Sequence, residues 1–96
     1  MLETVVLHLT NGGFIIGTFR KRYTDGSILL KQPAMIIPSK DELLGNFMMT
    51  QYHPFTEEEE VTFGSYSYIS YTNASLDIEQ EYLEYLKDKN EKTELH

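Results

Sequence analysis

The chain has 96 residues, a formal net charge of −7 and no cysteine. A chain of this length forms one domain with a modest core, and the lack of cysteine excludes disulfides, thiolate metal ligands and cysteine nucleophiles. No apolar run is long enough for a membrane-spanning helix, so we expect an intracellular, cytoplasmic protein without a membrane partner.

The charges are unevenly distributed along the chain. Residues 1–40 carry five basic and two acidic residues, whereas residues 41–96 carry three lysines and thirteen acidic residues. The net charge opposes a protein that binds nucleic acid over its whole surface. The basic first part leaves room for a local site, and we expect the acidic second part to oppose binding on the face that it covers.

Two strands and a hairpin turn are expected at the start of the chain. Residues 4–9 alternate weakly between two faces, and residues 14–19 are β-branched and aromatic. Between them stands Asn11-Gly12-Gly13, whose residues accept a positive φ and favour a tight turn. Gly17 indicates a bend or bulge in the second strand.

The next segment contains a turn, a strand and two prolines. The turn at Thr24-Asp25-Gly26 precedes a third strand at residues 27–32. Pro33 and Pro38 bracket residues 34–37, and proline cannot donate to a sheet ladder. Residues 34–37 are therefore expected to form an extension or an edge rather than a central strand.

Two further strands complete the β part of the chain. Residues 47–52 and 65–71 are rich in apolar and aromatic side chains, and Gly64 comes directly before the second of them. Five short strands joined by tight turns predict a mainly β fold. We expect residues 1–72 to form a small, strongly bent, five-stranded antiparallel barrel.

Residues 73–96 are expected to end the same domain with an amphipathic helix and an acidic tail. The helix is predicted at residues 75–90, with Asn73 or Ser75 as its cap. Acidic residues in the first turn and lysines towards the end suit the helix dipole. We expect its apolar stripe to pack on the chain's own sheet; the stripe consists of Ile78, Tyr82, Tyr85 and Leu86.

Residues 5–19 resemble the first Sm motif, in which alternating hydrophobic residues are followed by Asn-Gly and, after a spacer, by Gly in the next strand. Phe63-Gly64 ahead of the last strand is similar to the Arg-Gly pair of the second motif, with phenylalanine in place of arginine. Tyr23 and Ser27 stand where the family usually has Asp and Asn, and the helix is C-terminal here. The chain thus resembles a divergent, phage- or virus-type member of the Sm-like (LSm) family.

This resemblance implies a homo-oligomeric ring. In the family, the fourth strand of one subunit pairs with the fifth strand of the next, and this pairing removes the unpaired edges of a small sheet. The last two strands are apolar and aromatic enough to serve as such edges. The expected interface residues are Phe47, Met49, Tyr66 and Tyr68.

The resemblance also implies single-stranded RNA as a partner. In the family, RNA contacts the loops before the third and fifth strands, and the matching residues here are Tyr23, Asp25, Ser27, Phe63, Gly64 and Ser65. Aromatic rings at these positions can stack on bases, and polar side chains can contact base edges or a 2′-OH. Next to the first loop stands a basic triplet suited to phosphate contacts, Arg20, Lys21 and Arg22.

Other interpretations stay open. The same fold and oligomer can act as a structural or protein-interaction module without RNA, and a monomeric SH3- or OB-like barrel can cover its edges with the C-terminal helix. Each candidate residue also has a structural explanation. The basic triplet can be a solvated turn, Phe63 and Tyr23 can be packing residues, and turn chemistry accounts for Asp25-Gly26.

Catalysis has little support in the sequence. The three histidines, His8, His53 and His96, are scattered, and no cysteine assists them. No spacing typical of a metal site and no glycine-rich phosphate loop is present. We therefore expect no enzyme, no metal site, no catalytic residue and no cofactor.

Overall fold

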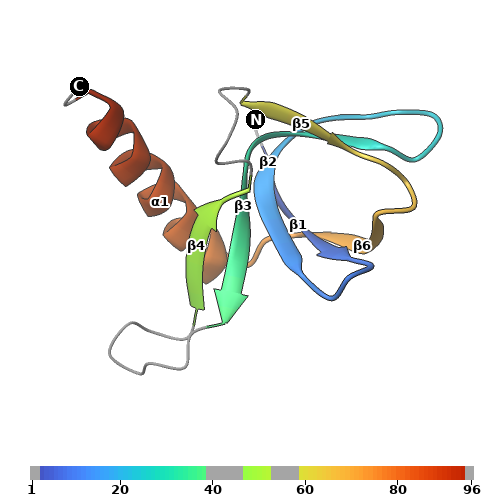
Figure 1. The fold of residues 1–96 in the computed structure, drawn as a ribbon, viewed down its shortest axis with the longest axis horizontal. Helices are drawn as coiled ribbons and strands as arrows, with labels where there is room; N and C mark the ends of the chain where they lie inside the picture. The colour runs from blue at the N-terminus through green and yellow to red at the C-terminus, as the bar shows by residue number, and fades with distance from the viewer. Residues whose placement is uncertain (1–2, 39–46, 53–58, 95–96) are drawn as a thin grey trace.

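The computed structural model describes residues 3–38, 47–52 and 59–94 (Figure 1). Its elements, in chain order, are β1 (Thr4–Leu9), β2 (Phe14–Arg22), β3 (Ile28–Pro38), β4 (Phe47–Gln51), β5 (Glu60–Phe63), β6 (Tyr68–Asn73) and α1 (Leu76–Glu94). The expected mainly β fold with a C-terminal helix is confirmed. Within the described ranges, no helix is both long and apolar enough to cross a membrane.

All six strands belong to one antiparallel sheet. Its order is β4-β3-β2-β1-β6, and β5 pairs with the first part of β3. In the described part of the chain, β4 and β6 end this order without pairing with each other, so the sheet does not close. The expected five-stranded barrel is therefore wrong in strand number and in closure, because β3 takes β5 as a partner for its first part and β4 for its second.

Strand β3 also differs from the expected short strand followed by an edge. Residues 34–37 continue the strand: residues 34–36 are paired on both sides, with β2 and with β4, and Ile37 is paired with β4. Gln32 has a φ of 50°, and the register with β2 shifts between Ile16 and Thr18. Pro33 therefore falls in a bulge, where the ladder does not need the N–H that proline lacks.

Two glycines have the expected roles. Gly12 has a φ of 93°, and the Leu9 N–H donates to the Gly13 carbonyl at 2.8 Å, which closes the turn between β1 and β2. Gly17 lies at the register shift of β2, where a Cβ would stand 3.1 Å from the Cβ of Leu30. The bend needs a residue without a side chain because β3 approaches it so closely.

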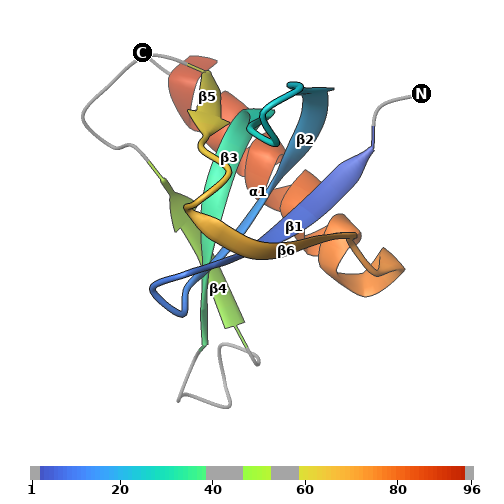
Figure 2. The same ribbon diagram turned by 90° about the vertical axis from the view of Figure 1, so that its right-hand side faces the viewer.

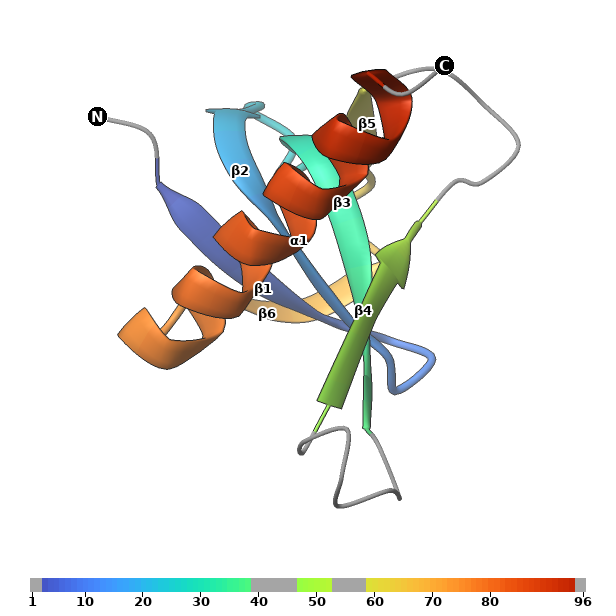
Figure 3. The ribbon, with the colours of Figure 1, turned by 90° about the vertical axis from the view of Figure 1, so that its left-hand side faces the viewer.

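The sheet has an apolar layer on each face. On one face lies the main core, formed by Val5, Leu7, Leu9, Ile15, Ile28, Leu30 and Phe63. On the other face α1 crosses the sheet (Figure 3), and its expected stripe packs there on Ile16 and Ala34. Seen from the side of the core, α1 lies behind the sheet and β6 in front (Figure 2).

Helix α1 is fixed at its start and at its middle. The Ser75 carbonyl accepts from the Glu79 N–H at 2.9 Å, and the Ser75 hydroxyl oxygen accepts from the Ile78 N–H at 3.4 Å, so Ser75 is the cap. Two turns later, the fully buried Tyr82 donates its hydroxyl to the Gln32 carbonyl at 2.9 Å. This hydrogen bond anchors α1 to β3 at the bulge of Gln32 and Pro33, which we call the kink of β3.

Candidate nucleic-acid interface

The loops before β3 and β6 lie against each other at the end of the molecule away from α1 (Figure 1). The Tyr68 hydroxyl, at the start of β6, donates to the carbonyl of Gly26 and so links the first loop to the strand that follows the second. Gly26 has a φ of 92°, and a Cβ placed on it would stand 3.2 Å from the Cβ of Ser65. We call the two loops together, residues 23–27 and 64–67, the loop cluster.

The loop cluster borders an open pocket of about 520 Å³. Its lining residues are Asp25, Ser27, Gly64, Ser65, Tyr66 and Ser67. Four of the expected RNA-binding residues, from segments far apart in the sequence, therefore line one pocket. Hydroxyl groups, a carboxylate and an aromatic ring are thereby gathered where a base could be held.

The first loop is shaped by turn chemistry around Asp25. The Asp25 carboxylate accepts from the Ser27 N–H at 2.8 Å, and the Tyr23 N–H donates to the Ser27 carbonyl at 2.8 Å. The hydrogen bonds that Asp25 receives from Ser27 lower the pKa of its carboxyl. An ionised Asp25 repels phosphate and accepts hydrogen bonds, so it suits the donor groups of a base edge.

The aromatic candidates do not lie where the sequence suggested. Phe63 is only 4% exposed and packs in the main core, with its ring centroid 5.1 Å from that of Tyr52. The expected stacking role of Phe63 is therefore wrong, because its ring faces inward. Tyr66, expected at a subunit interface, lies in the turn before β6 and is 95% exposed. It is the aromatic ring of the pocket that is free to stack.

Sequence reasoning placed Tyr66 at a subunit interface rather than in the RNA site, because the alternation Ser-Tyr-Ser-Tyr favours a strand. The strand begins only at Tyr68, and Gly64 and the two serines around Tyr66 are the signal that could have indicated a turn. Tyr68, the other tyrosine expected at an interface, packs instead on the chain's own core. Its hydroxyl donates a hydrogen bond within the chain, to the Gly26 carbonyl.

The basic triplet lies on the last part of β2, next to the loop cluster. Arg20 pairs with Glu60, with 3.3 Å between Nε and Oε1. Lys21 Nζ lies 4.9 Å from the ring centroid of Tyr23, and Arg22 Cζ lies 5.7 Å from that of Tyr71. Lys21 and Arg22 thus each make a cation–π contact with a tyrosine ring, and both side chains are exposed to solvent.

The remaining interface candidates lie on β4. Phe47 and Met49 are half-buried and face α1, whereas Met48 between them is 49% exposed. On β6, at the other end of the strand order, Ile69 is 65% exposed. Among the large hydrophobic side chains of the two terminal strands, the exposed ones are therefore Met48, Ile69 and Tyr71, and none of these is an expected interface residue.

The described residues offer no centre for metal chemistry. Among them, no group of three or more His, Asp or Glu side chains is placed to hold a metal ion. His8 stacks on Phe14, with ring centroids 4.6 Å apart, which is a packing role. His53 and His96 lie outside the described residues.

Comparison with known proteins assigns no family to the chain. No protein-family model and no curated protein matches it. Its function is therefore inferred from the geometry of the loop cluster.

Proposed function

We propose that the chain is an Sm-like subunit that forms a homo-oligomeric ring and binds single-stranded RNA at the loop cluster. The convergence of the two loops on one pocket carries this proposal. Tyr66 supplies a stacking surface for a base, and the carboxylate and hydroxyl groups beside it supply acceptors and donors for base edges or a 2′-OH.

The distribution of charge supports the same proposal. Lys21 and Arg22 adjoin the loop cluster, and their repetition around a ring would create a belt of positive charge for phosphates. The acidic helix α1 packs on the far face of the sheet (Figure 3). The carboxylates of α1 up to Asp88 therefore lie away from the loop cluster, which supports a local RNA site despite the net charge of −7.

The two terminal strands support ring formation. In the described chain, β4 and β6 each have one neighbour, and an unpaired strand edge is a template for another strand. Met48 and Ile69 expose apolar surface there. Pairing β4 of one subunit with β6 of the next would satisfy both edges at once.

A structural oligomer without RNA is the second candidate. Two observations favour it: Arg20 is already paired with Glu60, and Phe63, the counterpart of the family's arginine, is buried. Both reduce the similarity to the family's RNA pocket. The two candidates share the ring and differ only in RNA binding.

Fluorescence anisotropy with labelled poly-U and poly-A RNA tests the RNA site on the full chain. We expect Tyr66→Ala to weaken binding by about 5- to 150-fold, since stacking contributes about 1–3 kcal/mol per base, and Tyr66→Phe to retain it. The variant Lys21→Gln/Arg22→Gln should flatten the dependence of log K on log salt by about 0.7 for each phosphate that the protein no longer neutralises. Lys87→Gln/Lys89→Gln, with the same charge change on α1, is the control.

Each outcome separates the candidates. A measured mass of the native assembly equal to that of the monomer at micromolar concentration rules out the ring. An oligomer that binds neither RNA supports the structural candidate. RNA binding that Tyr66→Ala and the double variant on β2 leave unchanged rules out the loop cluster as its site.

A further inference from the structure

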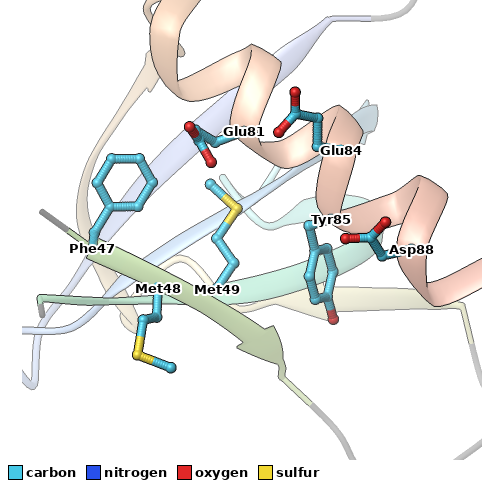
Figure 4. Close-up of a pocket in the computed structure, with 7 residues that line it drawn as sticks. All are labelled: Phe47, Met48, Met49, Glu81, Glu84, Tyr85 and Asp88. Atoms are coloured by element: carbon cyan, nitrogen blue, oxygen red, sulfur yellow. The ribbon is translucent and has the colours of Figure 1, made fainter. Parts of the chain in front are cut away.

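A groove lies between β4 and α1, on the face of the sheet opposite the main core (Figure 4). Phe47 and Met49 point from β4 towards the helix, and Tyr85 reaches down from the helix towards β4. All three side chains are half-buried. They give the groove, whose volume is about 300 Å³, an apolar floor that the described residues leave partly uncovered.

The wall of the groove is acidic. Glu81, Glu84 and Asp88 line it from α1, and all three are exposed. Within the described part of the chain, no ion pair to these three carboxylates is observed. Their spacing of three and four residues puts like charges next to each other along one side of the helix.

The three carboxylates of this wall do not stabilise α1 itself. Like charges at these spacings repel and destabilise a helix slightly, and α1 already packs on the sheet through its apolar stripe. A cation bound in the groove would relieve the repulsion, and a large apolar side chain beside it would cover Phe47 and Met49. Anionic partners such as RNA are repelled by the same three carboxylates.

We propose that this groove binds a basic amphipathic segment of a partner protein, in which a large apolar side chain is flanked by lysine or arginine. The apolar side chain lies on the floor, and the flanking cations pair with Glu81, Glu84 and Asp88. Arginine suits this wall best, because its guanidinium can bind a carboxylate through two hydrogen bonds. The groove shares no lining residue with the loop cluster, so this inference does not depend on RNA binding.

Three labelled peptides test the proposed chemistry by fluorescence anisotropy on the full chain. The first is Arg-Leu-Lys-Phe-Arg-Leu-Lys, the second has serine in place of its apolar residues, and the third has glutamate in place of its basic residues. We expect saturable binding of the first peptide alone, weakening as salt is raised. Equally tight binding of the serine peptide, or no saturable binding of the first, overturns the proposal.

A matched pair of variants tests whether the peptide binds in the groove between β4 and α1. Glu81→Gln/Glu84→Gln/Asp88→Asn removes the wall, and Glu3→Gln/Glu59→Gln/Asp77→Asn removes the same charge from exposed positions elsewhere. We expect the first variant to bind the peptide about tenfold more weakly than the second, from the usual size of exposed ion pairs. Equal weakening in both means attraction to net charge alone and overturns the proposal. Circular dichroism establishes that both variants are folded.

Discussion

Removal of the Tyr82 hydroxyl group is the most direct test of how α1 is held on the sheet. Tyr82 has no exposed surface, and its hydroxyl lies 2.9 Å from the Gln32 carbonyl and 3.2 Å from the Lys31 carbonyl. The Thr18 hydroxyl lies 3.4 Å away. Tyr82→Phe keeps the ring in place and removes only this polar anchor at the kink of β3.

The expected loss follows from burial. A fully buried carbonyl that loses its donor costs about 1–3 kcal/mol, and part of this loss is recovered here because the hydrogen bond is only partly buried. We expect the free energy of unfolding to fall by about 1–2 kcal/mol, which lowers Tm by about 5–15 °C in a domain of this size. Thermal unfolding followed by circular dichroism measures the change.

The control is Tyr66→Phe, which removes a hydroxyl from a side chain that is 95% exposed. We expect this variant to keep the Tm of the parent chain. A Tyr82→Phe variant with the same Tm as this control would refute the reasoning that the buried hydrogen bond anchors α1.

The pH dependence provides a second measurement of the same residue. Burial raises the pKa of the Tyr82 phenol above its ordinary value of 10.0. The unfolded chain therefore ionises first, and the parent chain loses stability as the pH rises from 10 through the folded-state pKa. Because Tyr82→Phe lacks this contribution, the gap in Tm between the two proteins should be widest at neutral pH and narrow above pH 10.

Three further predictions test the glycines and the first loop. Gly17→Ala should lower the free energy of unfolding in urea by about 1–3 kcal/mol, because the new Cβ would stand 3.1 Å from two carbons of Leu30; an unchanged midpoint contradicts this. Gly26→Ala should destabilise more than Gly12→Ala in the same assay, since both have a positive φ but only Gly26 faces a neighbour, at 3.2 Å; equal losses contradict the contact between the loops. Asp25→Asn should reduce the loss of stability at acid pH. The pKa of Asp25 is lowered in the folded chain, so its ionised carboxylate stabilises the fold at pH values above the ordinary pKa of 3.8, and this contribution disappears as the pH falls through the folded-state pKa. Identical acid unfolding curves contradict this reasoning.

The local elements follow closely from the sequence. The strand at residues 4–9, the turn at Asn11-Gly12-Gly13 and the Ser75 cap lie where they are expected. Each depends on neighbours within a few residues: side-chain alternation, tolerance of a positive φ, or a hydroxyl that reaches the next backbone N–H. The helical stripe is equally local, and its packing on the sheet is confirmed.

The candidate site is only partly accessible to such reasoning. Asp25, Ser27, Gly64 and Ser65 were grouped by a resemblance to a family, and the structure brings them to one pocket. Which aromatic side chain serves that pocket depends on the direction in which each ring points. Because β6 begins at Tyr68 rather than at residue 65, Tyr66 lies in a turn and points to solvent.

The sequence by itself therefore determined the first two strands, the helix, the turns, the cap and the basic triplet beside the first loop, because each of these depends on short-range chemistry. Tertiary structure decided which partner each part of β3 takes, whether the sheet closes, and that Phe63 is buried while Tyr66 is exposed. These outcomes depend on pairing between segments far apart in the chain, where register and burial outweigh local preference. For the same reason, only the folded chain shows the acidic groove between β4 and α1.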